Sequence, residues 1–318
     1  MSIRAVLYDA TGQDREVDLL DDEVKVDKDR LLWIDIDGRD PADLVRAGAA
    51  IGLDGTSLRR LSKVEGRARL LRLPDRIVLT LGTVEPDDPE AARHELDIVI
   101  GANHIVTVHD RPIWAVDEFR KEIDLEELVG RLDSASFVAG LVDSIFTAYF
   151  RQVEAIERDI DELDVVAVRN RADASFLSTV VVLRRRIARL RRALAPNREA
   201  LLPLERPDVA HTSDLGTVWP GISQRLERAI DGVENARELL VGSFDLYLGR
   251  SSQRTNDVMK ILTLVSAIAL PGIVLAGVMG MNFQMPFFDD ANNFFVVAGA
   301  MAAFAIAILV IARWRSWI

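Results

Sequence analysis

The sequence predicts an α/β cytoplasmic N-terminal domain, a long helical stalk and two C-terminal transmembrane helices. Short β-branched runs separated by turn residues fill roughly the first 110 positions, which is typical of strands. Amphipathic helical spacing follows, and two long apolar runs come last. These patterns divide the chain into an α/β domain at 1–111, a helical hairpin region at 112–210, a stalk helix at 211–257, a first transmembrane helix at 258–282, an external loop at 283–293, a second transmembrane helix at 294–312 and a cytoplasmic tail at 313–318.

The N-terminal domain has the pattern of mixed strands and helices. Its predicted strands are AVLYDA at 5–10, LLWIDID at 31–37, RIVLTLGTV at 76–84, HELDIVIGA at 94–102 and HIVTVHD at 104–110. Two segments between them, 40–51 and 56–65, have helical spacing, and Pro41 suits the first turn of a helix.

Composition and motifs exclude several classes of protein. No glycine-rich nucleotide motif and no nucleophile arrangement occurs, so we expect neither an enzyme nor a catalytic cofactor. The absence of cysteine leaves only oxygen and histidine nitrogen as metal ligands. His94, His104 and His109 lack the spacing of a metal site, and we interpret them as ordinary surface or packing residues. A net charge of -11 argues against nucleic-acid binding.

The region 112–210 is predicted to form a helical hairpin. Apolar residues recur every three to four positions from Phe137 to Leu163, which predicts one long amphipathic helix. Its polar face is acidic near the end, whereas 184–192 is rich in arginine. An antiparallel turn at about residue 170 would bring the two stretches together in part, so we expect ion pairs between the helices.

The stalk helix is predicted to run on into the first apolar run. Thr212 or Ser213 can cap its start, Pro220-Gly221 can interrupt its first turns, and a helix from about 222 to 281 would be ~90 Å long. One stripe of this helix is apolar and consists of Leu226, Ile230, Val233, Leu239, Leu240, Phe244 and Leu248. A single rod cannot bury such a stripe, so the sequence predicts that several copies associate.

Both C-terminal runs have the length of membrane spans. Thr263 and Ser266 are the only polar side chains from 261 to 281, and about 20 helical residues match a hydrocarbon core of ~30 Å. Basic residues flank the two inner ends, namely Arg250, Arg254, Lys260, Arg313 and Arg315, whereas the loop between the spans has none. By the positive-inside rule both termini are cytoplasmic. With no apolar signal segment at the N-terminus, we expect a multi-pass protein of the inner (plasma) membrane.

The end of the first span carries a recognisable motif. Gly280-Met281-Asn282 stands at the outer end of the first of two C-terminal spans. This arrangement resembles the signature of the CorA-type divalent-cation channels. The segments FDLYL at 244–248 and TNDVMKILT at 255–263 are similar to that family's approach to its first span. The resemblance covers the layout of the whole chain.

The resemblance implies a funnel-shaped homopentamer in which five first spans line a pore. The implied pore-lining and gate positions are Asp245, Asn256, Met259, Leu262, Ser266, Leu270, Ile273 and Gly277. Gly280, Met281 and Asn282 would form the external mouth, where the Asn282 amides could hold the waters of a hydrated ion. Rings of large apolar side chains lower in the pore could stop ions by dewetting.

The sequence departs from the family in two places. Many members carry an acidic residue soon after the triplet, whereas here Asp289 and Asp290 come several positions later and are the candidate metal contacts. Known members close when magnesium binds acids between subunits. The corresponding positions here are Arg59, Arg60 and Gly221, which offer no side-chain ligand for magnesium.

Three functions remain open from the sequence. The first is a channel for Mg²⁺ that can also pass Co²⁺ or Ni²⁺, with lipid, divalent cations and further copies of the chain as its partners. The second is a Zn²⁺ transporter of the related ZntB type. The third is a membrane-anchored coiled-coil scaffold or sensor without transport, which would have no functional need for Asn282.

Overall fold

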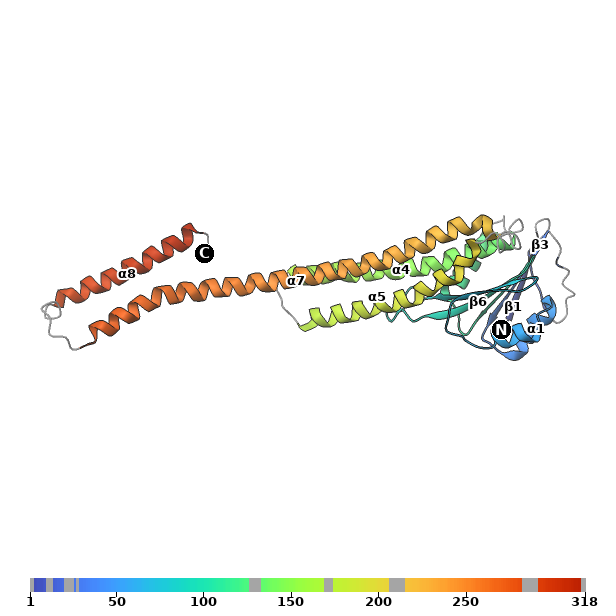
Figure 1. Cartoon of the computed structure of the whole chain (residues 1–318), viewed down its shortest axis with the longest axis horizontal. Helices are drawn as coiled ribbons and strands as arrows, with labels where there is room; N and C mark the ends of the chain where they lie inside the picture. Colours follow the sequence, from blue (N-terminus) through green and yellow to red (C-terminus); the bar gives the residue numbers. More distant parts are fainter. Residues whose placement is uncertain are drawn as a thin grey trace. The chain divides into compact units, whose positions relative to one another are not determined.

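The computed structural model describes residues 3–9, 14–19, 26, 29–125, 133–168, 174–205, 215–281 and 291–315 (Figure 1). The chain forms two compact units. The first consists of Met1–Val166 with Asp173–Phe244, and the second of Ala167–Ala172 with Asp245–Ile318.

A mixed sheet of seven strands organises the first unit, in the order β2-β1-β3-β7-β6-β5-β4. The strands are β1 Ile3–Asp9, β2 Arg15–Glu16, β3 Arg30–Asp37, β4 Arg69–Arg72, β5 Ile77–Thr83, β6 His94–Ile100 and β7 His104–His109. Strands β3 and β7 are parallel, and every other neighbouring pair is antiparallel. The five predicted strands are confirmed. The sequence analysis missed β2 and β4 because these short, arginine-containing segments lack the β-branched residues typical of strands.

The two faces of the sheet bury different layers of side chains. Leu32 and Ile34 lie in one hydrophobic cluster with Leu44 of α1 (Pro41–Ile51) and Leu61 of α2 (Gly55–Leu61). Trp33 points to the opposite face, because neighbouring strand residues alternate. There it packs edge-on against Phe119 of α3 (Trp114–Leu125) and Phe137 of α4 (Ser134–Val168). Helices therefore cover both faces.

Helix α2 ends earlier than the sequence analysis predicts. Its start is capped by Asp54, whose carboxylate accepts a hydrogen bond from the backbone N–H of Ser57 at 3.0 Å. The helix stops at Leu61 instead of residue 65. The backbone N–H groups of Glu65 and Gly66 donate to the carboxylate of Glu95 at 3.0 and 2.7 Å, which holds this stretch out of the helix.

Helices make up most of the described residues after β7. They include α5 (Ala174–Leu201), the short η2 (Leu202–Glu205), α7 (Leu215–Met279) and α8 (Ala291–Trp314). The predicted long helix from 137 to 163 is confirmed as part of α4. Helix α7 continues through Pro220, so the predicted break there is wrong. The proposed caps Thr212 and Ser213 and the turn near residue 170 lie outside the described residues.

Helices α4, α5 and α7 run side by side in the first unit (Figure 1). Leu226 and Val233 of α7 are each only 2% exposed within the single chain. A Cβ at Gly232 would stand 3.6 Å from Val153 of α4, which shows how closely these helices pack. The first half of this stripe therefore needs no other copy to cover it, contrary to the prediction, because it is buried within the single chain. Leu239 and Leu248 stay exposed.

The arginine-rich face of α5 pairs with two helices. Arg186 donates to Asp159 of α4 at 2.9 Å, as the hairpin predicts. Two other arginines of α5 pair instead with acids of α7: Arg191 with Glu234 and Arg198 with Glu227, both at 3.1 Å. Helix α7 thus supplies carboxylate partners for α5 that the predicted hairpin of two helices does not contain.

Candidate functional site

The most apolar stretches of the chain lie on α7 and α8. Stretches of 18 residues reach a mean hydropathy of 2.4 within Val218–Met279 and 2.8 within Asn292–Trp314, and these stretches are not buried. Leu270 and Ile273, for example, are 64% and 66% exposed. Both helices are long and apolar enough to cross a membrane. Their exposed aliphatic side chains would be unfavourable in water, which is consistent with a hydrocarbon environment.

Helix α8 covers one side of α7 within the second unit. A Cβ at Gly272 would come within 2.9 Å of the Met301 Cε, so glycine permits close contact at this point. A recess of about 520 Å³ between the helices is lined by Ile268, Pro271, Gly272, Leu275, Ala300, Met301, Ala302, Phe304 and Ala305. The residues of α7 that face α8 are therefore centred near Ile268.

The opposite side of α7 carries the positions that the resemblance assigns to a pore. These positions are all exposed: Asp245, Asn256, Met259, Leu262, Ser266, Leu270, Ile273 and Gly277. Successive helical residues are ~100° apart, so Leu262, Ser266 and Leu270 lie roughly opposite Ile268. The structure thus brings the predicted set together on one uncovered face and separates it from the face that α8 covers.

The end of α7 holds the described part of the Gly-Met-Asn triplet. The backbone N–H of Gly280 donates to the carbonyl of Ala276 at 2.9 Å, and that of Met281 donates to the carbonyl of Val278 at 3.2 Å. Met281 is exposed just after the last helical residue. Asn282, Asp289 and Asp290 lie outside the described residues.

Two hydroxyl groups in the first span differ in their partners. Thr263 donates to the backbone carbonyl of Met259 at 2.8 Å, which satisfies its hydroxyl within the helix. Ser266 forms no hydrogen bond with any residue that the structure describes. A hydroxyl without a partner is unfavourable in hydrocarbon, so the Ser266 side of α7 suits water or another polar surface better than lipid.

The first unit contains a buried ionic network that the sequence analysis missed. Asp35 of β3 accepts hydrogen bonds from Thr107 at 2.5 Å and His109 at 3.1 Å, and it pairs with Arg120 of α3. Burial opposes ionisation of Asp35, but the bonds from His109 and Thr107 and the charge of Arg120 lower its pKa overall. The sequence signal for this network is the presence of polar residues inside the two strand segments LLWIDID and HIVTVHD. The strands pair in parallel, and their register places Asp35 opposite Thr107.

This network favours the protonated form of His109. Burial disfavours its charge, yet the hydrogen bond to Asp35 and that carboxylate's charge raise its pKa overall. Its second ring nitrogen lies 2.7 Å from the carbonyl of Arg111, which can only accept. Both ring nitrogens of protonated His109 can therefore donate, one to Arg111 and the other to Asp35. No group of three or more His, Asp or Glu side chains able to hold a metal occurs in the described parts of the chain.

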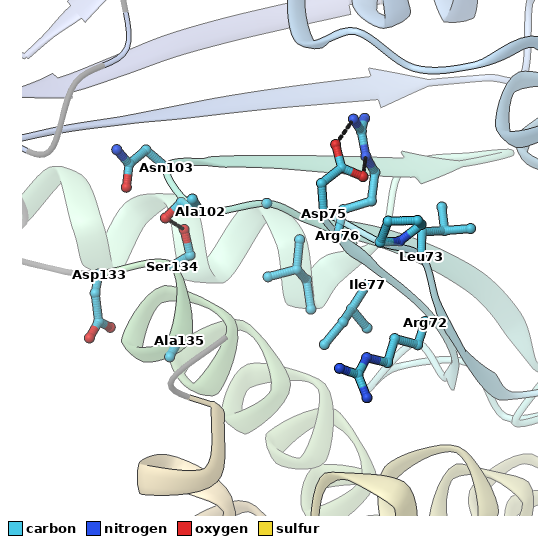
Figure 2. A pocket seen from close by; sticks show the side chains of 13 residues that line it. Arg72, Leu73, Asp75, Arg76, Ile77, Ala102, Asn103, Asp133, Ser134 and Ala135 are labelled. Atoms are coloured by element: carbon cyan, nitrogen blue, oxygen red, sulfur yellow. Dashed lines mark hydrogen bonds and ion pairs between the residues drawn. The ribbon is translucent and has the colours of Figure 1, made fainter. Parts of the chain in front are cut away.

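A polar pocket of about 270 Å³ lies where two strand turns meet the start of α4 (Figure 2). Asp75 and Arg76 pair with each other, and hydrogen bonds from Arg76 lower the pKa of Asp75. Asp133 accepts from the backbone N–H of Ser136 at 2.7 Å, and Ser134 donates to the carbonyl of Ala102 at 2.8 Å. Because these groups already have partners inside the protein, the pocket is not a candidate ligand site.

The resemblance places the family's regulatory magnesium site at Arg59, Arg60 and Gly221, and none of these residues carries a carboxylate. Arg59 and Arg60 are exposed in the last turn of α2. Gly221 of α7 lines a pocket of about 500 Å³ and has open space where a Cβ would be. The carboxylate of Asp143 in the same pocket already accepts a hydrogen bond from Arg225 at 2.8 Å. Arg59, Arg60 and Gly221 therefore offer no side-chain ligand for magnesium.

Comparison with known proteins identifies the family. The model of the CorA-like Mg²⁺ transporter protein family matches residues 28–313. The chain belongs to this family. Its members are transporters and not enzymes, and this chain is accordingly a divalent-cation transporter of the CorA type.

Individual relatives agree with this assignment. The chain is 27% identical over 293 residues to the cobalt/magnesium transport protein CorA of Thermotoga maritima, covering 90% of this chain and 83% of that one. The complete structure of the CorA magnesium transporter from Methanocaldococcus jannaschii matches with a TM-score of 0.77 at 22% identity, over 99% of this chain and 98% of that one. The ZntB cytoplasmic domain of Vibrio parahaemolyticus matches with a TM-score of 0.64 at 14% identity, over 80% of this chain and 100% of that one. The two structural matches show the shared fold.

Proposed function

We propose that this CorA-type chain forms a homopentameric channel for Mg²⁺ in the inner membrane, with Co²⁺ and Ni²⁺ as further substrates and with both termini in the cytoplasm. The observation that carries the proposal is the uncovered face of α7 opposite α8. This face begins at Asp245 and leads toward the Gly280-Met281-Asn282 triplet.

The uncovered face calls for several copies of the chain. One α7 and one α8 cannot enclose a path for water, and Ser266 is poorly suited to lipid because its hydroxyl forms no hydrogen bond to another described residue. A ring of α7 helices with the α8 helices outside would turn Ser266 toward water and the apolar face of α8 toward lipid. The relatives named for magnesium and cobalt transport support this reading.

The proposed pathway passes an ion that keeps its waters. Mg²⁺ loses its water shell reluctantly, so amide oxygens of Asn282 repeated around the mouth would hold those waters and spare the ion dehydration. Asp289 and Asp290 of the external loop would attract cations to the mouth. Further in, rings of Met259, Leu262 and Leu270 would resist wetting and act as the gate.

A Zn²⁺ transporter of the ZntB type is the second candidate, supported by the fold match to a ZntB cytoplasmic domain. Zn²⁺ favours histidine nitrogen and thiolate sulfur, whereas residues 215–318 contain neither histidine nor cysteine. The oxygen-only ligands of the proposed pathway therefore favour Mg²⁺.

The deciding experiment measures ion flux into liposomes that contain the purified chain. Mg²⁺, Co²⁺, Ni²⁺ and Zn²⁺ are supplied in turn. We expect Mg²⁺ uptake by the wild type, its loss in Asn282→Ala, and normal uptake in Asn292→Ala, an exposed amide at the start of α8. Normal transport by an assembled Asn282→Ala protein would reject the pore mouth, whereas an assembled wild type that carries none of the four ions would favour the scaffold function.

The gate has a separate test in the same liposomes. Replacing Met259 and Leu262 by serine should raise basal Mg²⁺ flux, because a polar ring admits water. The matched control replaces Val258 and Ile261 by serine, at the same depth but on other faces of α7. Equal flux in both double variants would move the constriction elsewhere, with Leu270 as the next position to test.

A further inference from the structure

A groove of about 1010 Å³ runs between α5 and α7 within the first unit. Ile187 and Leu240 form its buried floor. Leu177, Val181 and Val241 line it as well, and they remain 47%, 46% and 53% exposed. The single chain therefore leaves a long aliphatic surface uncovered in the part of the molecule that lies outside the membrane spans.

Arginine surrounds this aliphatic surface. Arg184, Arg191, Arg192 and Arg237 line the groove. Glu234 neutralises two of them, pairing with Arg191 at 3.1 Å and with Arg237 at 3.4 Å. Arg184 and Arg192 form no ion pair with any residue that the structure describes. In a chain of net charge -11, two uncompensated guanidinium groups beside an apolar floor form a local site for an anion.

We propose that the groove binds a single-chain anionic amphiphile, with its acyl chain on the floor and its carboxylate at Arg184 and Arg192. Guanidinium groups bind carboxylates through paired, charge-assisted hydrogen bonds. The two arginines are eight residues apart on α5, so their Cα atoms are ~12 Å apart and their side chains can converge on one head group.

Size and charge favour this occupant over a protein segment. Small-molecule pockets have volumes of roughly 300–1,000 Å³, which matches the groove. The floor would bury an acyl chain, which releases ordered water and favours binding. The site does not depend on the transport function, since every residue that lines it belongs to α5 or to the part of α7 before Asp245.

The experiment uses the full-length chain in lipid nanodiscs. The probe is dodecanoate with a photoreactive diazirine at the end of its chain. After irradiation, mass spectrometry locates the labelled peptides. We expect label within 177–195 and 237–244, competed by unmodified dodecanoate and not by its uncharged methyl ester.

Variants test the role of the two arginines. Arg184→Gln with Arg192→Gln should lower labelling at least tenfold, since the loss of even one charge-assisted contact weakens binding by roughly this factor. Arg185→Gln is the matched control, because Arg185 is an exposed arginine of α5 that does not line the groove. It should label as the wild type does.

Three results would overturn the proposal. Equal labelling of the double variant would show that the arginines do not bind the head group. Equal competition by the methyl ester would show that only the apolar floor matters. Absence of label in the assembled protein, together with cross-links between copies across the groove, would show that a second copy fills it.

Discussion

The two units of this transporter differ in which side chains they bury: the first buries polar and charged groups, and the second leaves large apolar side chains exposed. In the first unit, Trp33 is buried beside the ionised Asp35, and that carboxylate has three partners. In the second unit, large aliphatic side chains such as Ile273 are exposed. The first unit is therefore stabilised by its own contacts, whereas the second exposes apolar side chains that suit a hydrocarbon environment.

The strongest way to break the first unit is to remove a buried hydrogen-bonding hub. The Gln152 side chain donates to the carbonyls of Glu85, Pro86 and Asp88 at 2.6, 3.1 and 2.7 Å, and it accepts from Arg186 at 2.9 Å. Gln152→Leu should destabilise the fold by about 3 kcal/mol, because these buried groups lose their partner. Urea unfolding and faster hydrogen exchange in 77–100 would measure this loss.

A glutamine on the surface provides the control for this substitution. Gln224 of α7 is exposed, so Gln224→Leu should change stability by less than about 0.5 kcal/mol. If the two variants unfold alike, the Gln152 contacts contribute little and the contrast between the units rests on apolar burial alone.

The second prediction concerns pH and the first unit only. The folded pKa of His109 is raised, so its stabilising contribution is complete below the ordinary value near 6.5 and is lost as the pH rises through the folded value. The pKa of Asp35 is lowered, so its contribution is complete above about 3.8 and is lost as the pH falls through the folded value.

We therefore expect unfolding stability to fall by on the order of 1 kcal/mol as the pH rises from about 6 to 9. His109→Gln should be less stable at about pH 6 and should lose most of this slope. Urea unfolding of both proteins across this pH range is the measurement. An unchanged slope in the variant would assign the pH dependence to other groups.

A third prediction sharpens the description of the second unit through its two hydroxyl groups. Ser266→Val should reduce Mg²⁺ flux in liposomes roughly 3- to 10-fold, because the proposed pore would lose a hydrogen bond worth about 0.5–1.5 kcal/mol to the waters of the ion. Thr263→Val should conduct normally, since its hydroxyl is already bonded to Met259. Equal losses would mean that both effects come from helix packing.

The last prediction is that magnesium has almost no effect on the protease sensitivity of the first unit. Magnesium at millimolar concentration should leave the first unit nearly as sensitive to protease as before, because Arg59 and Arg60 repel the ion and Gly221 offers no ligand. Protease cleavage within 40–70 and 215–240, with and without Mg²⁺, tests this. Strong protection would reveal a replacement site, with Asp231 and Glu234 as the first acids to substitute.

Local patterns in the sequence determined much of this protein. The prediction of a first span at 258–282 followed from the length of an apolar run, because a hydrocarbon core requires about 20 such residues regardless of their neighbours. The five longer strands and the long helix α4 followed from periodicity in the same way. The family followed from the triplet at 280–282, whose meaning depends on its position after the first span.

The tertiary structure alone decided which surfaces meet. The spacing of Leu226 and Val233 predicted a contact between copies, but both side chains are buried within the single chain. The pairing of Asp35 with His109 joins residues 74 positions apart, and the groove lined by Arg184 and Arg192 lies between α5 and α7. A sequence pattern indicates that a face must be covered, but it does not identify the covering segment. Many segments satisfy the same local pattern, so packing between distant parts of the chain determines the partner.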